Sequence, residues 1–169
     1  GPSAEFLRVV AASPVRELTG HALDGWTASG SGRLTLAFDM PFDHVDQTKL
    51  NGAYQVTGNA IVPGVAEMAL AQVNGRVEFT ESSVSARGIT ATWLGGPVSF
   101  DVATRAGATT VTGQGQVNVP AALAQFGVPL ARRFSGTSTV RFAGTVRGGQ
   151  VSHVIESSLQ DVAIDLPPP

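Results

Sequence analysis

The residue types that could bind a metal ion come together at one place in the chain. The candidate ligands are Asp39, Asp43, His44 and Asp46. A calcium site needs about six to eight oxygen ligands from one compact loop. Because Pro41-Phe42 interrupts this run, the pattern favours a solvated loop, and we expect no metal site.

Paired carboxylates are a second arrangement that could do chemistry, because glycoside hydrolysis uses two acidic side chains around one bond. Glu78 with Glu81, or Asp161 with Asp165, supplies the residue types. These carboxylates fall on the polar side of predicted strands, where acidic side chains usually only keep a protein soluble. We therefore assign no glycosidase chemistry to them.

Nucleophilic catalysis is not indicated either. His21, His44 and His153 lie far apart in the sequence, and no Gly-x-Ser-x-Gly motif lies near any of them. Arg132 and Arg133 close a predicted helix, where cations favour the negative end of the helix dipole, and we prefer this explanation to contact with a lipid phosphate. We expect a protein that is not an enzyme and that needs no cofactor.

The composition indicates a β-rich protein and argues against some partners. The net charge is −2 and the charged fraction is 14%, below the roughly 25% of an average globular protein. Without a basic excess, we expect no nucleic-acid partner. The 20 glycines, with many threonines, serines and valines, favour an all-β fold with tight turns, and the absence of cysteine excludes a disulfide framework.

The sequence has the features of a piece of a longer protein. It contains no run of about 20 apolar residues and no secretory signal, and Gly1-Pro2 resembles the scar of a cleaved expression tag. We expect four parts in this piece. They are a tag scar and helix N-cap (1–3), a helix plus β-meander repeat (4–135), the start of a second repeat as a hairpin (136–166) and a linker-like tail (167–169).

Apolar residues recur at every second position from Asn74 to Val102, which is the period of a strand with one dry face. Turn signals at Glu81–Ser83 and at Gly95-Gly96 divide this stretch into three successive strands. The period slips at Asn74-Gly75, where we expect a bulge. Similar alternation before and after this stretch predicts an all-β protein, a curled antiparallel β-meander that forms a groove or half-barrel.

Two short helical regions are predicted beside the strands. Ser3 to Ala12 reads as a helix capped by Ser3. Pro120 to Phe134 reads as a second helix that Gly127 to Pro129 splits into two turns. The apolar residues of the second region share one helical stripe. They are Leu123, Phe126, Leu130 and Phe134.

These two helices cannot cover the dry face of the sheet. About eight strands make a sheet about 38 Å wide, whereas two helices of about 10 Å diameter cover roughly half of it. Either the sheet closes on itself as a sandwich, or an apolar groove stays open. The mixture of Val and Leu with Ala and Gly on the dry face favours the groove, because it is thin packing for a closed core.

The side chains expected to line this groove alternate along several strands. They are Leu34, Leu36, Phe38, Val77, Phe79, Val98, Phe100, Val102, Val140 and Phe142. Gly113 and Gly115 fall on the same face, where they narrow the wall or leave room for a guest. Such a surface would hold an extended hydrocarbon, at about 0.8 kcal/mol per buried methylene.

Several short motifs, in this order and spacing, resemble the YhdP branch of the AsmA-like bacterial envelope proteins. They are Leu50-Asn51-Gly52, Gly58-Asn59-Ala60-Ile61, Val73 to Thr80, Leu94-Gly95-Gly96-Pro97, Phe134-Ser135-Gly136 and Ser158 to Pro167. The resemblance implies a periplasmic segment of a long protein anchored in the inner membrane. It also implies a trough of repeated β-meanders that carries phospholipids between inner and outer membranes, with other envelope proteins as possible partners.

Two other functions remain open at this point. A closed β-sandwich that acts as a spacer or protein-docking module would use the same side chains to fill its own interior. A carbohydrate-binding domain would need aromatic residues on the polar face, and the chain offers few, with one tyrosine and two tryptophans.

Overall fold

The computed structural model describes residues 1–12, 16, 23–39, 49–63, 68–80, 82–148 and 150–165, without the side chains at 38 and 39. Most of these residues belong to strands, as the alternation predicts. The strands are β1 (Thr27–Ser29), β2 (Gly32–Asp39), β3 (Lys49–Val62), β4 (Leu70–Thr80), β5 (Val84–Trp93), β6 (Gly96–Arg105), β7 (Ala108–Asn118), β8 (Phe134–Arg147), β9 (Gln150–Ser157) and β10 (Val162–Ile164). The helices are α1 (Ser3–Ala11), α3 (Val119–Gln125) and the 3-10 helix η3 (Ala131–Arg133).

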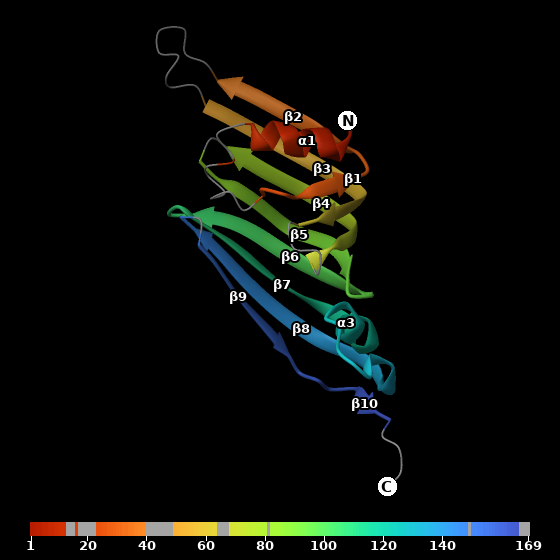
Figure 1. Cartoon of the computed structure of the whole chain (residues 1–169). Helices are drawn as coiled ribbons and strands as arrows, with labels where there is room; N and C mark the ends of the chain where they lie inside the picture. Colours follow the sequence, from red (N-terminus) through yellow and green to blue (C-terminus); the bar gives the residue numbers. More distant parts are fainter. Residues whose placement is uncertain are drawn as a thin grey trace.

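Within the described residues the strands form one antiparallel sheet with two free edges (Figure 1). Strands β3 to β8 follow one another in sequence order, as expected for a meander. At one edge β1 and β2 both pair with β3, and at the other β9 and β10 both pair with β8. The sheet is therefore open, and the fold prediction of a curled meander is confirmed.

A crease crosses the first half of this sheet. The register shifts in β3 near Gly58, in β4 near Asn74-Gly75 and in β5 near Gly88, and Gly30 separates β1 from β2 on the same line. All these glycines have positive φ, as expected at bulges. Bulges bend strands and increase their twist, so the predicted bulge at Asn74-Gly75 is one part of a line along which the sheet curls.

Polar side chains satisfy the backbone groups that the bulges release. The Asn74 Oδ1 atom accepts a hydrogen bond from the Gly58 N–H at 2.9 Å, and the Asp101 Oδ1 atom accepts one from the Gly88 N–H at 2.7 Å. Each such bond replaces a missing ladder bond, which is why a creased sheet can keep its backbone groups paired.

The buried side chain of Asn59 stabilises the crease through hydrogen bonds. Its side chain is fully buried, and its amide nitrogen donates to the carbonyl oxygens of Ser31 and Thr57, each at 3.0 Å. Its amide oxygen accepts from the Ser3 hydroxyl, which in turn accepts from the Tyr54 hydroxyl at 2.8 Å. This chain of bonds attaches the start of α1 to β3.

Helix α1 lies over β2 and β3 in Figure 1, on the side of the sheet that carries the apolar core. The Phe6 ring stacks on the Tyr54 ring, with centroids 3.8 Å apart and planes 5° apart. The predicted cap of this helix was wrong, because Pro2 occupies the N-cap and makes no side-chain capping bond. Ser3 instead uses its hydroxyl for the contact with Tyr54 and Asn59.

Two details of the predicted turns and helices change. The turn after β5 uses Leu94 and Gly95, with φ of 48° and 76°, whereas Gly96 already belongs to β6. The second helical region splits as predicted, but Phe126 and Leu130 do not share a buried stripe. Because α3 ends at Gln125 and Leu130 has φ of 71°, both side chains are exposed.

Candidate functional site

One row of residues crosses the sheet without a break, with one member on each strand from β2 to β9. In sheet order the row is Leu34, Tyr54, Val77, Ala86, Val102, Val111, Gly144 and His153. Residues paired in register point to the same face of a sheet. With strands about 4.8 Å apart, seven intervals make this row about 34 Å long.

Shorter rows flank it on the same face. On one side lie Leu36, Gly52, Phe79 and Val84. On the other side lie first Ile89, Phe100, Gly113, Phe142 and Ile155, and then Ala91, Val98, Gly115, Val140 and Ser157. We call the surface made by these four rows the inner face, and the opposite surface the outer face.

The inner face brings together nine of the ten residues predicted to line a groove. The tenth, Phe38, pairs with Leu50 at the end of β2, and its side chain lies outside the described residues. The predicted list of lining residues left out Tyr54, Val111 and Ile155, although the alternation of β7 already puts Val111 on the face of Gly113. The register of β3, β7 and β9 against their neighbours identifies them, and the alternation within each strand was the available signal.

The exposure of the inner face varies from its edges to its centre. At the two edges Leu34 is 41%, Leu36 43% and Ile155 50% exposed. Val98 and Val140 are 4% and 5% exposed, because they belong to the core that the protein packs for itself. The accessible apolar surface therefore includes both edges, while part of the centre is covered by the chain's own side chains.

Aromatic rings cover the glycines of the inner face. The Phe79 ring lies over Gly52, and the Phe142 ring lies over Gly113. Phe142 also meets Trp93, with ring centroids 6.1 Å apart. On a flat sheet, strands β5 and β8 would be about 14 Å apart, so this contact requires the inner face to curve and the rings to lean over the strands between.

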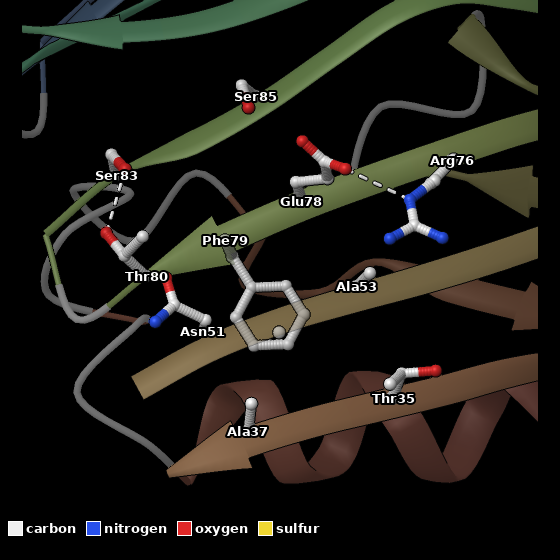
Figure 2. A pocket seen from close by; sticks show the side chains of 11 residues that line it. Thr35, Ala37, Asn51, Ala53, Arg76, Glu78, Phe79, Thr80, Ser83 and Ser85 are labelled. Carbon is white, nitrogen blue, oxygen red and sulfur yellow. Dashed lines mark hydrogen bonds and ion pairs between the residues drawn. The ribbon is translucent and has the colours of Figure 1, made fainter. Parts of the chain in front are cut away.

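The outer face is polar and carries two shallow concavities, of about 400 and 420 Å³. Figure 2 shows the first, where the Arg76 Nε–H donates to Glu78 at 3.0 Å and the Thr80 hydroxyl bonds that of Ser83 at 2.8 Å. Small residues such as Ala53, together with Asn51 and Phe79, complete its lining. Most residues that line the two concavities belong to the outer face, although Phe79 borders the first and Val98 the second.

The residues considered for catalysis or metal binding are dispersed in the described part of the chain. Glu78 is exposed in its ion pair with Arg76, and Asp161 and Asp165 are exposed on either side of β10. Asp39 ends β2, and its predicted partners at 43, 44 and 46, like Glu81, lie outside the described residues. His153 stands alone at the end of the long row on β9.

No group of three or more His, Asp or Glu residues that could hold a metal ion is found among the described residues. Nor is any helix in that part of the chain long and apolar enough to cross a membrane.

Comparison with known proteins places the chain in a family. No curated protein and no solved structure matches it. The family model described as YhdP protein, however, matches all of residues 1–169. The chain therefore belongs to the YhdP family of bacterial envelope proteins.

Proposed function

We propose that this chain is a periplasmic segment of an envelope protein whose inner face carries the acyl chains of phospholipids between the inner and outer membranes. In this proposal the role is not enzymatic, and the described residues contribute an apolar surface. The parent protein would be anchored in the inner membrane, with phospholipid as cargo and other envelope proteins as possible partners.

The observation that carries this proposal is the unbroken row from Leu34 on β2 to Val111 on β7. Its members are apolar apart from the Tyr54 hydroxyl, which is already bonded to Ser3. Tyr54 and Ala86 are buried in the chain's own core, so an acyl chain would contact the exposed Leu34 and the half-buried valines of the row, which present no polar group. Because apolar attraction has no preferred direction, a chain could slide from strand to strand without breaking directional bonds.

The exposed edges of the sheet favour a role in moving acyl chains over a role in storing them. Leu34 and Leu36 are exposed at the β2 edge, and Ile155 is exposed at the β9 edge, so the apolar surface ends in the open on both sides. Burying a long acyl chain supplies on the order of 10 kcal/mol, which is enough to hold it out of water. A spacer module would gain nothing from exposed leucines at these positions, whereas a protein-docking module would bury them against its partner.

The test is a photo-crosslinking amino acid at position 100 or 112 of this segment, in the full-length protein in cells. Phe100 lies on the inner face, and Thr112 is exposed on the outer face of the neighbouring strand. Phospholipid adducts at position 100, with none at position 112, are the expected result. Equal labelling at both positions, or only protein adducts at position 100, would favour the spacer or docking function instead.

A further inference from the structure

The turn that joins α3 to η3 places apolar side chains in water. Phe126 is 57% exposed and Leu130 65%, with Val128 between them also exposed. They follow directly on α3, at the end of the sheet remote from α1 (Figure 1). In a helix that faces the core, the same residues would be buried. In this turn they are exposed to solvent instead.

The backbone of this turn is also unusual, a feature that it shares with the exposed Leu159, which has φ of 49°. Leu130 has φ of 71°, in the left-handed region that glycine and asparagine adopt more easily than leucine. Residues held in sparsely populated backbone regions cluster at functional sites. Packing within the described part of the chain gives no reason for a leucine here.

The stretch of sequence that contains the turn has a basic excess, although Asp161 and Asp165 lie beside it in space at the two ends of β10. Residues 102–155, a run of 54, contain five arginines and no aspartate or glutamate. Two of these arginines, Arg132 and Arg133, are exposed on η3 immediately after the turn. Because α3 ends at Gln125 and η3 has only three residues, the helix dipole first preferred as the explanation of these cations does not account for them. The Asp165 N–H donates to the Arg133 carbonyl at 2.8 Å, but no described carboxylate forms an ion pair with either guanidinium.

We propose that the turn at 126–130, together with Arg132 and Arg133, is a docking surface for an anionic phospholipid bilayer. Apolar side chains on a short tip enter the headgroup region, and neighbouring guanidinium groups bind lipid phosphates, often with two hydrogen bonds each. Three apolar residues and two arginines bury far less than the roughly 800 Å² per partner of a stable protein interface. The combination therefore suits a membrane surface better than a protein.

The experiment measures sedimentation of the 169-residue chain with vesicles of phosphatidylcholine alone or mixed with the anionic phosphatidylglycerol. The chain is expected to bind the anionic vesicles selectively. The double variant Arg132→Gln, Arg133→Gln should bind about 30-fold less, because each cation near an anionic surface contributes about fivefold. Leu130→Asn should bind about tenfold less, because asparagine keeps the left-handed backbone but loses the apolar contact.

The matched control removes two positive charges from another part of residues 102–155, the stretch that contains no aspartate or glutamate. Arg141→Gln, Arg147→Gln alters two exposed residues of β8 and should change binding less than threefold. Circular dichroism melts check that every variant is folded. The proposal fails if the chain binds both vesicle types equally or not at all, or if the control loses as much binding as Arg132→Gln, Arg133→Gln.

This docking surface is independent of the inner face. Crosslinking of lipid at Phe100 could succeed while vesicle binding fails, and the reverse is equally possible. The two experiments therefore separate the two proposals.

Discussion

The ring of Phe142 on β8 lies over Gly113 on β7, in the space that a side chain at position 113 would occupy. A Cβ atom there would also come within 2.6 Å of the Ser99 carbonyl oxygen and 2.7 Å of the Phe100 Cβ. The inner face thus depends on glycine for its curvature, because the backbone itself forms the surface on which the aromatic ring rests.

Gly113→Ala is therefore expected to destabilise the protein by about 1–3 kcal/mol, as overpacking in a tight core does. The matched control is Gly144→Ala on the same face, where the nearest atom to an added Cβ is 3.8 Å away. That change should be neutral or slightly stabilising. Urea unfolding measures both, and equal effects would show that Phe142 does not require the glycine.

Asn59→Ala is expected to cost about 2–4 kcal/mol, because the carbonyl groups of Ser31 and Thr57 lose their donor and the buried Ser3 hydroxyl loses its acceptor. Asn51→Ala, at an exposed position of the same strand, should change the unfolding free energy by less than about 0.5 kcal/mol. A small effect at Asn59 would mean that the crease is held by other contacts.

Phe6→Ala tests how firmly α1 is attached to the sheet. Phe6 stacks on Tyr54 and lies 6.1 Å from the Phe79 ring, and it is only partly buried. We expect a loss of about 2 kcal/mol in thermal unfolding. Phe126→Ala is the control, because that side chain is exposed and should contribute within about 0.5 kcal/mol. Equal melting temperatures for the two variants would contradict the packing described for α1.

Ala106→Asn should stabilise the hairpin between β6 and β7. Ala106 and Gly107 have φ of 48° and 72°, which is the pattern of a turn that prefers Asn-Gly. The expected gain is about 0.5–1 kcal/mol. Ala143→Asn, at an exposed strand position, should give no gain. Denaturant midpoints compare the two, and a loss of stability at position 106 would argue against this turn.

Much of the fold could be predicted from the alternation of apolar residues. The period of two marks β4, β5 and β6, and the slip at Asn74-Gly75 marks a bulge, because both signals are local in the sequence. What could not be predicted depends on contacts between distant residues. The local sequence predicts that the Ser3 hydroxyl caps the helix. Its actual partners, Tyr54 and Asn59, are more than 50 positions away in the sequence.

The sequence predicts which residues share the inner face, but it does not predict how exposed each of their side chains is. Alternation places Val98 and Val140 on the same face as Leu34, and the register agrees. Alternation cannot distinguish side chains buried at the centre of the inner face from those exposed at its edges, because burial depends on how the sheet curls. Likewise, a helical stripe placed Leu130 in the core, whereas its left-handed backbone turns it outward.

The most direct test of the central claim asks whether lipid contacts the inner face from one edge of the sheet to the other. Photo-crosslinkers go into the full-length protein at three adjacent pairs, the first member of each on the inner face. The pairs are Leu34 and Thr35, Val111 and Thr112, and Ile155 and Val154. Phospholipid adducts are predicted at positions 34, 111 and 155 and none at their neighbours. Equal labelling within each pair, or labelling at an edge without labelling at Val111, would contradict the central claim.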